Sequence, residues 1–318
     1  MPGYSKSITV GVVVIVIVSF FLGYLFVVPP RDFPIHKLIT VEKDLSVVSI
    51  AESLESDGVI TSPKFFSLLT IALGSEKKIV AGDYYFSQPA SLFEIIRRLT
   101  GGVYGLTPIT VTLPEGETSE NMAKILEKQL PRFDKEEFLN QVSDKEGFLF
   151  PDTYFFYQNT LFPDVINKME ANFETKIASL KKDIEASKKT LNQIITMASI
   201  VEAEARTKKD RQIVAGILWK RIDRGMPLQV DAPFAYITNK STYELTREDL
   251  RRDSPYNTYT RKGLPPTPIN NPGAEAINAS LHPLETEYFY YLSDKKGNMY
   301  YARDYSEHLR NKRLYLSQ

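Results

Sequence analysis

The sequence predicts an α+β protein with one transmembrane helix near its amino end. Three observations lead to this class. An uncharged apolar stretch covers residues 8–28, strand-like and helix-like stretches alternate over residues 38–102, and a strongly apolar helix begins at Leu191. We expect the chain to divide into a tail at 1–7, the transmembrane helix at 8–28, a small module at 29–105, a connecting region at 106–190 and a second folded domain at 191–318.

The composition excludes several classes of site. The 39 Lys and Arg residues balance 39 Asp and Glu residues, so charge gives no support for a nucleic-acid partner. The chain has no cysteine, which excludes disulfides, thiol nucleophiles and zinc–thiolate sites. Its three histidines, His36, His282 and His308, do not share a metal-type spacing, and we expect no metal and no organic cofactor.

The apolar stretch from Ile8 to Val28 has the length of a membrane-spanning helix. At roughly 1.5 Å per residue it covers about 30 Å, the thickness of bilayer hydrocarbon. A cleaved signal peptide is the alternative, but its exit would carry small residues, whereas bulky residues and Pro29 stand here. Flanking charges hardly decide the orientation. The short tail and long body favour a single-pass protein of the cytoplasmic membrane, with its amino end inside and the body outside.

The module at 29–105 is predicted to be a small α+β unit. Ser62 and Pro63 are a typical N-cap and first helical residue. Gly101 and Gly102 are expected to end the last helix of the module. The expected strands lie at 38–41 and 81–86, and the expected helices at 46–54, 63–73 and 91–99.

The region from 106 onward mixes short strands, helices and long loops. A strand is expected at 109–113, followed by a helix that Thr118 caps. The aromatic stretch 146–156 contains Pro151 and is expected to form a loop or short strands. A charged helical stretch is expected at 163–189. Residues 253–273 show little regular pattern, and long loops of this kind in compact domains are usually functional.

Glu202 is the sharpest local signal for chemistry. Counted back in helical steps, it shares a face with Ala198, Ile195 and Leu191, so its carboxyl ends an apolar stripe. Desolvation there raises the pKa of a carboxyl, as a general acid requires. Glu204, two residues on, points to roughly the opposite side. The alternative is that the helix ends in a solvated Glu-Ala-Glu, and periodicity alone leaves both interpretations open.

A glycosidase of the common type needs a second carboxylate, and Asp231 and Asp152 are the candidates. Asp231 follows a predicted turn, so it could equally be a turn cap. Amide and hydroxyl side chains suited to sugar hydroxyls and N-acetyl groups follow, although each one alone is more often structural. They are Gln229, Tyr236, Asn257, Thr258, Tyr259 and Asn271. No P-loop, GxGxxG, GxSxG or HExxH motif is present.

Six segments in order resemble the YceG-like family of endolytic murein transglycosylases. They are EGFLFPDTY (146–154), ASIVEAEA (198–205), RGMPLQVD (224–231), SPYNTYTRKGLPPTPINNPG (254–273), ASLHP (279–283) and the stretch 301–308. The chain departs from the family pattern at Ala232-Pro233, where Pro-Thr is usual, and at Lys220, where Asn is common. The first departure puts the shape of the loop after Gln229 in doubt.

The resemblance implies a LysM-like glycan-binding module at 29–105 and a YceG-like catalytic domain that starts in the connecting region. It implies that Glu202 is the catalytic acid/base. The pocket residues that it implies are Glu146, Gln229, Asp231, Tyr236, Asn257, Tyr259 and His308. The expected partners are peptidoglycan glycan strands, peptidoglycan synthases (penicillin-binding proteins), and the membrane through one helix.

The implied reaction cleaves the β-1,4 bond between N-acetylmuramic acid and N-acetylglucosamine in nascent strands and leaves a 1,6-anhydro end. Two other functions stay open. In the first, the protein binds or scaffolds the cell wall without catalysis, and a buried, salt-bridged Glu202 would favour this function. In the second, Asp231 and Glu202 act with water as a hydrolase, which leaves a reducing end.

Overall fold

The computed structural model describes residues 27–238, 244–246 and 248–316. All but the last two residues of the predicted transmembrane helix at 8–28 lie outside this part. Within it, no helix has both the length and the apolar character needed to cross a bilayer. The chain forms two compact units. Unit 1 runs to Pro108 and includes Tyr157–Asn159, and unit 2 comprises Ile109–Phe156 and the chain from Thr160 onward.

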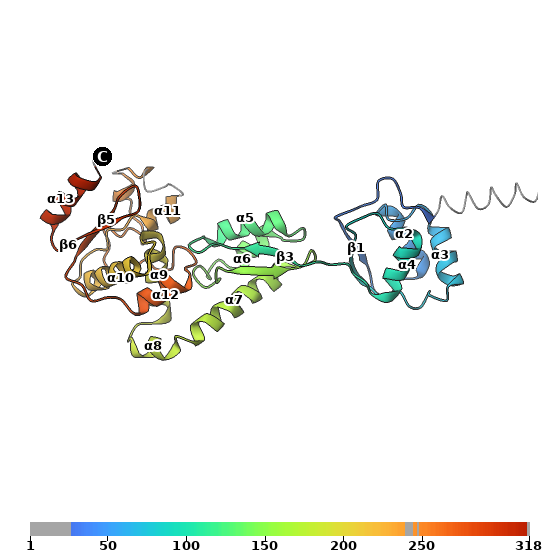
Figure 1. Cartoon of the computed structure of the whole chain (residues 1–318), viewed down its shortest axis with the longest axis horizontal. Coiled ribbons are helices and arrows are strands. Elements are labelled where there is room, and N and C mark those ends of the chain that lie inside the picture. Colours follow the sequence, from blue (N-terminus) through green and yellow to red (C-terminus); the bar gives the residue numbers. More distant parts are fainter. Residues whose placement is uncertain (1–26, 239–243, 247, 317–318) are drawn as a thin grey trace, which may run out of the picture. The chain divides into compact units, whose positions relative to one another are not determined.

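Unit 1 is a small α+β fold with one two-stranded antiparallel sheet (Figure 1). Its strands are β1 (Leu38–Val41) and β2 (Gly82–Tyr85), and its helices are α2 (Val47–Ser56), α3 (Pro63–Ala72) and α4 (Leu92–Gly101). Serine residues cap all three helices, and Pro63 opens α3 as expected. The strands and helices predicted for this region are therefore present, and no end is shifted by more than two residues.

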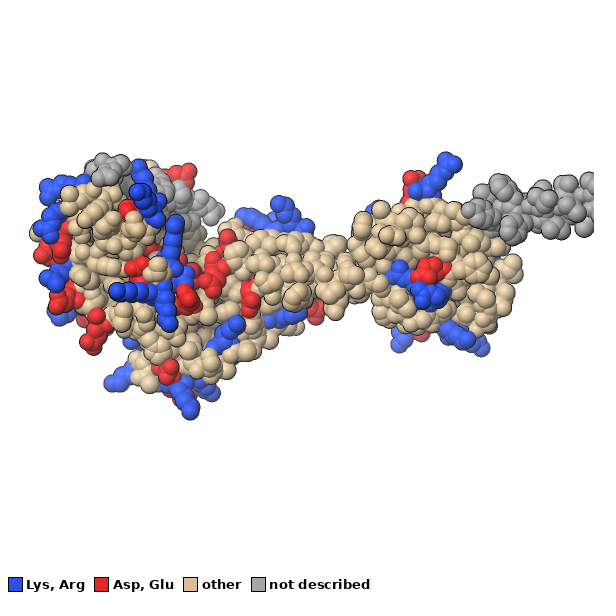
Figure 2. Space-filling model, in the orientation of Figure 1, with Lys and Arg blue, Asp and Glu red and all other residues tan. Residues whose placement is uncertain are grey.

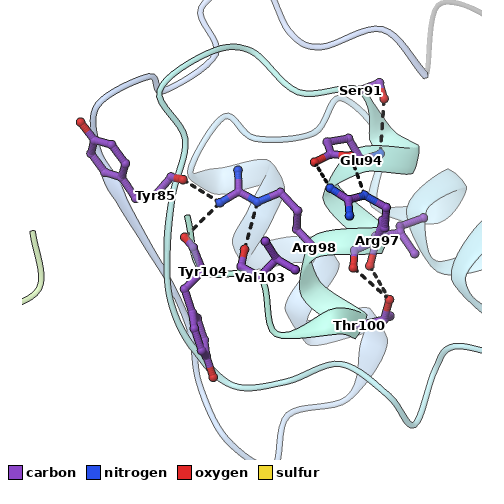
Figure 3. Close-up of polar contacts among 9 residues, drawn as sticks. Tyr85, Ser91, Glu94, Arg97, Arg98, Thr100, Val103 and Tyr104 are labelled. Atoms are coloured by element: carbon purple, nitrogen blue, oxygen red, sulfur yellow. Dashed lines mark hydrogen bonds and ion pairs between the residues drawn. The ribbon is translucent and has the colours of Figure 1, made fainter. Parts of the chain in front are cut away.

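Arg98 of α4 holds the segment that leaves unit 1 (Figure 3). Its guanidinium donates hydrogen bonds to the carbonyls of Tyr85 at 2.7 Å, Val103 at 3.0 Å and Tyr104 at 3.0 Å. It also lies over the ring of Phe86, 4.1 Å from the ring centroid. The Tyr104 carbonyl also accepts from the backbone N–H of Tyr85, so Arg98 adds to this backbone pairing and connects α4, β2 and the exit of the unit.

Unit 2 begins with a second antiparallel pair of strands, β3 (Ile109–Thr112) and β4 (Thr153–Phe156). Two short helices, α5 (Ser119–Gln129) and α6 (Lys135–Gln141), lie between these strands in the chain. The predicted charged helix at 163–189 is two helices, α7 (Phe162–Ala178) and α8 (Lys181–Ala186). Val111, Met122 and Tyr154 belong to the shared core of this part.

The centre of unit 2 is α9 (Leu191–Glu204), which begins with a capping box made by Thr190 and Gln193. It packs against α10 (Lys208–Asp223), α11 (Ala232–Thr238) and α12 (Ala274–Leu281). Every residue of α9 from Ile194 to Val201 is buried. The helix therefore has no single apolar stripe, and its periodicity does not tell which side of its last turn faces a site.

The last described elements are a third antiparallel strand pair, which is a hairpin, and a helix. The hairpin is β5 (Tyr290–Ser293) and β6 (Met299–Ala302), and the helix is α13 (Tyr305–Tyr315). The long stretch 253–273 is irregular, as predicted, and is preceded by a short 3-10 helix, η2 (Asp249–Arg251). The mixed α+β class is thus confirmed for the part of the chain that the structure describes.

Candidate active site

A cleft of about 1550 Å³ opens within unit 2. Side chains from α5 and α6 line it together with the last turn of α9, Arg221 of α10, the segment 228–236, β5 and α13. Of the predicted substrate-binding residues, the structure brings six together along this cleft and leaves Asn257 outside. The six are Glu146, Gln229, Asp231, Tyr236, Tyr259 and His308.

Glu204, the last residue of α9, presents its carboxyl to the cleft. Burial, with a smaller contribution from the nearby charge of Asp231, raises its pKa to about 7. The Tyr291 hydroxyl and the backbone N–H of Ala232 act in the opposite direction. A carboxyl of this kind is partly protonated near neutral pH, which is the condition for a general acid.

Glu202 does not line the cleft, which corrects the expected position of this carboxyl. Its side chain is 7% exposed and forms an ion pair with Arg211, while the N–H of Gly273 donates to its other oxygen at 3.0 Å. Arg211 also donates to the Ala205 carbonyl at 3.1 Å and to Glu275 at 3.2 Å. Burial raises the pKa of Glu202, against the effects of Gly273 and Arg211.

The positions of Glu202 and Glu204 follow from helix geometry. Two residues along an α-helix turn by about 200°, so the two carboxyls point to nearly opposite sides. The relation between them was therefore predicted correctly, but the side that faces the cleft was not. The signal that sequence reasoning lacked is the all-round burial of α9.

Asp231 is the second carboxyl of the cleft near Glu204, and it has a fixed partner. The hydroxyl of Tyr259 donates to its Oδ1 at 2.6 Å. Asp152, the other predicted candidate, is outside the cleft lining and accepts a hydrogen bond from Asn172 at 3.0 Å. That bond lowers the pKa of Asp152, so it is a structural carboxylate.

Gln229 is held by its backbone and by its side chain. Its φ of 54° lies in the left-handed region, and its N–H donates to the Thr258 carbonyl at 2.9 Å. Arg221 donates to its side-chain oxygen at 2.6 Å and to the carbonyls of Pro227 and Phe289. The guanidinium carbon of Arg221 also lies 5.3 Å from the centre of the Tyr290 ring. Arg221 was not predicted from the sequence as a site residue.

Glu146 also lines the cleft and is largely buried. It accepts hydrogen bonds from the N–H of Ser119 at 3.1 Å and from Asn271 Nδ2 at 2.8 Å. Burial outweighs these bonds and raises its pKa to about 7. Burial thus raises the pKa of two carboxyls of the cleft, Glu146 and Glu204, to about 7.

Asn271 connects three segments of unit 2 and does not line the cleft. Its side-chain oxygen accepts from the N–H groups of Gly147 at 2.9 Å and Leu149 at 3.0 Å. Its backbone N–H donates to Glu117 at 3.0 Å, and its carbonyl accepts from Gly116 at 2.9 Å. Asn271 was predicted as an amide suited to binding sugar, but its side chain makes hydrogen bonds within the protein instead.

Asn257 is fully buried, and its amide is used within its own loop. It donates to the carbonyls of Leu250 at 3.1 Å and Arg252 at 2.8 Å, and accepts from the N–H groups of Tyr259 at 2.9 Å and Thr260 at 3.2 Å. This amide supports the loop that carries Tyr259, and it has no place on the cleft surface. Its effect on the site is therefore indirect.

Aromatic side chains cover much of the cleft wall. His308 of α13 stacks on Tyr290 with a centroid distance of 5.4 Å, and burial and neighbouring positive charge lower its pKa. Tyr305, 59% exposed, lies at 6.3 Å from His308. Tyr236, which also lines the cleft, has a pKa raised to about 12 by burial and by Glu146. Such flat, half-polar surfaces suit sugar rings.

Charge is mixed over the surface drawn in Figure 2, where Lys, Arg, Asp and Glu side chains are interspersed on unit 2. Within residues 27–238, 244–246 and 248–316, no group of three or more His, Asp or Glu side chains is arranged to hold a metal ion. The carboxyls of Glu146, Glu204 and Asp231 on the cleft wall instead interact with hydrogen-bonding neighbours.

Comparisons with known proteins agree on one family. The model of the YceG-like family matches residues 39–314. A protein of Bacillus subtilis named endolytic murein transglycosylase is 32% identical over 306 residues, which cover 88% of this chain and 84% of that protein. A protein of the same name from Streptococcus pneumoniae is 28% identical, covering 92% of this chain but 61% of its own length.

A solved structure extends the similarity to the fold. The crystal structure of a YceG-like protein from Listeria monocytogenes matches with a TM-score of 0.59 and 27% sequence identity. The match covers 86% of this chain and 98% of that one. The similarity therefore includes both units and the cleft-bearing part of the chain.

Proposed function

Because the chain belongs to the YceG-like family, we propose that it is an endolytic peptidoglycan lytic transglycosylase. It cleaves the bond between N-acetylmuramic acid and N-acetylglucosamine within glycan strands and leaves a 1,6-anhydromuramoyl end. The relatives' shared name supports the activity. The observation that carries the proposal is Glu204, a carboxyl in a large cleft with a pKa of about 7.

In the proposed mechanism Glu204 is first an acid and then a base. Its proton passes to the glycosidic oxygen as the bond from C1 to that oxygen breaks. The resulting carboxylate takes the proton of the sugar's own C6 hydroxyl, and that oxygen bonds to C1. Glu204 ends protonated again and no water is consumed. General acid–base help of this kind contributes about 10²–10⁴-fold, and the intramolecular hydroxyl adds a proximity advantage.

Burial is the main reason why Glu204 is protonated before the reaction, and the nearby charge of Asp231 acts in the same direction. The hydroxyl of Tyr259 donates to Asp231 and holds its carboxyl in place. In this proposal Glu202 stabilises the end of α9 through its contacts with Arg211 and Gly273, and it takes no part in the proton transfer. The sequence-based assignment of acid/base chemistry to Glu202 remains the competing hypothesis.

The size of the cleft supports cleavage inside a strand. Pockets for drug-sized ligands usually measure about 300–1,000 Å³. A cleft of about 1550 Å³ exceeds this range and offers room for sugars on both sides of the cleaved bond. A strand can then bind by its interior, as endolytic cleavage requires.

Two further roles complete the proposal. Residues 29–105 act as a LysM-like module that holds glycan, and residues 8–28 anchor the protein in the cytoplasmic membrane with the cleft outside. The cleavage then limits strand elongation next to the synthases, for which penicillin-binding proteins are the proposed partners. The uncharged apolar stretch and the α+β fold of unit 1 support these assignments.

Product analysis tests the proposal. The full chain in detergent is incubated with uncrosslinked glycan strands, in parallel with its Glu204→Gln and Glu202→Gln variants, and products are identified by mass spectrometry. Anhydro-ended fragments from the wild type and from Glu202→Gln, but not from Glu204→Gln, are expected. Activity in Glu204→Gln with none in a folded Glu202→Gln would return the acid/base role to Glu202.

The same measurement separates the other functions. Reducing ends in place of anhydro ends would indicate a two-carboxylate hydrolase that uses Asp231 with water. No cleavage by a folded, glycan-binding wild type would indicate a binding or scaffold protein. The buried ion pair of Glu202 favours that last function when considered alone, but the presence of Glu204 in the cleft removes this argument.

A further inference from the structure

The hydroxyl of Tyr291 is one of the few buried polar atoms that have no regular hydrogen-bond partner among the described residues. Tyr291 belongs to β5 and lines the cleft. Its hydroxyl approaches the Glu204 carboxyl closely enough to interact with it, but the geometry falls short of a regular hydrogen bond. A buried hydroxyl without a partner costs free energy, so its position calls for a reason.

The two carboxyls at this end of the cleft differ in how their tyrosines bind them. Asp231 accepts a complete bond of 2.6 Å from Tyr259. Glu204 faces Tyr291 without a complete bond. A tyrosine hydroxyl stabilises a carboxylate more strongly than a neutral carboxyl, because the acceptor is then charged. The bond to Glu204 is therefore expected to form when Glu204 loses its proton.

We propose that Tyr291 is a positioning residue that donates its hydrogen bond to Glu204 once the acid has given its proton to the leaving sugar. The inference rests on the proposed function and adds a step to it. The bond fixes the carboxylate for the return proton transfer from the C6 hydroxyl. Tyr291 itself keeps its proton throughout, so the balance of the reaction is unchanged.

Tyr291 is well suited to remain a donor. Burial raises its pKa far above the ordinary value, and the negative charges of Glu204 and Asp231 act in the same direction. Arg221 of α10 acts in the opposite direction but is already bonded to Gln229 and two carbonyls. Tyr291 is therefore protonated near neutral pH and can donate a hydrogen bond there.

The other groups near Glu204 do not replace this donor. The N–H of Ala232, at the start of α11, is fixed in the backbone and stabilises the carboxylate in both steps. Tyr259 of the following loop is bonded to Asp231. From α12, Glu275 faces Arg211. Of the side chains that influence Glu204 directly, Tyr291 is a donor and Asp231 is an anion.

The pH dependence of cleavage gives the first test, with Tyr291→Phe as the variant. The hydroxyl lowers the pKa of Glu204, so its loss raises that pKa and the alkaline fall of kcat/KM moves to higher pH. A shift of about one pH unit is expected, because a hydrogen bond to a charged group corresponds to roughly one unit. At pH 7 kcat falls about tenfold while KM changes little.

Tyr301→Phe is the matched control. Tyr301 lies opposite Tyr291 in the β5–β6 register, and its hydroxyl also donates to a carboxylate, that of Asp210, at 2.5 Å. It does not line the cleft. This variant loses a comparable bond on the same hairpin, so any general effect on the fold appears in both variants. The alkaline fall of kcat/KM in this variant is expected at the same pH as in the wild type.

Site-specific 3-fluorotyrosine at position 291 sharpens the test, because a more acidic hydroxyl donates more strongly. The alkaline limb should then move to lower pH, opposite to Tyr291→Phe. A carboxyl titration of Glu204 by ¹³C NMR, assigned with Glu204→Gln, measures the same shifts without turnover. Unchanged Glu204 titration in both variants would overturn the inference. An inactive wild type whose Glu204 pKa still shifts would reject the proposed activity and keep the Tyr291–Glu204 contact.

Discussion

The two sides of the last turn of α9 differ in how completely their polar groups are used. On one side Glu202, Arg211 and the N–H of Gly273 form a closed set, in which each charge has a partner. On the other side Glu204 lies in an open cleft beside Tyr291, whose hydroxyl has no regular partner. The first arrangement stabilises the fold, and the second is ready for a ligand and a proton.

Glu204→Gln is expected to give the largest effect. Gln has nearly the same shape but cannot donate an acidic proton, so cleavage should fall by at least about 10²–10⁴-fold. The rate of anhydro-end formation measures this loss, and circular dichroism checks the fold. A variant that keeps more than a tenth of the wild-type rate would remove Glu204 from the mechanism.

Glu202→Gln tests the closed side of the turn. The change leaves the buried Arg211 without its charged partner, and Glu275 compensates only in part. We expect the free energy of unfolding to fall by about 2–3 kcal/mol, somewhat below the usual cost of breaking a buried pair. Chemical denaturation measures it. Glu275→Gln, whose carboxyl is 58% exposed, is the control and should change stability by less than about 1 kcal/mol.

The Glu146→Gln variant tests the buried carboxyl of Glu146 through the pH dependence of stability. Because burial raises the pKa of Glu146 to about 7, its contribution to stability is complete below about pH 4.5 and is lost as the pH rises through 7. Gln cannot titrate, so the unfolding free energy of the variant should depend less on pH, by up to about 1.4 kcal/mol per pH unit. Unfolding free energies measured from pH 4.5 to pH 8 give the result. Equal slopes in the wild type and the variant would contradict it.

Tyr305→Ala should give the smallest effect. The ring is 59% exposed at the cleft, so its loss should raise KM about three- to tenfold, with stability and kcat nearly unchanged. Tyr315→Ala is the control on the same helix. Tyr315 stacks on Tyr300 at 3.6 Å and does not line the cleft, so its loss should reduce stability and leave KM unchanged.

Local signals predicted much of the fold. Ser62 and Pro63 marked the start of α3, and Thr118 marked the start of α5, because capping depends on a few adjacent residues. The long predicted helix at 163–189 was partly wrong, since it divides into α7 and α8. Charge pattern alone did not reveal the break near Ser179, which no glycine or proline marks.

The candidate site was predictable as a set but not in its details. Six of the predicted pocket residues line the cleft, whereas Asn257 and Asn271 are buried in loop hydrogen bonds that depend on distant segments. The choice between Glu202 and Glu204 depended on which neighbours pack around α9, and these come from α10, α11 and α12. Helical periodicity contains no information about those neighbours.

The connections made by Asn271 mean that the cleft forms late. Its side chain reaches Glu117, 154 residues earlier in the chain, and Glu146, 125 residues earlier. One wall of the cleft therefore forms only after segments of unit 2 that are far apart in the sequence have come together. Contacts between such distant segments form slowly in folding. An enzyme that cuts a cell's own wall thereby gains a safeguard, because a chain that is still folding or already unfolding has no assembled site with which to cut.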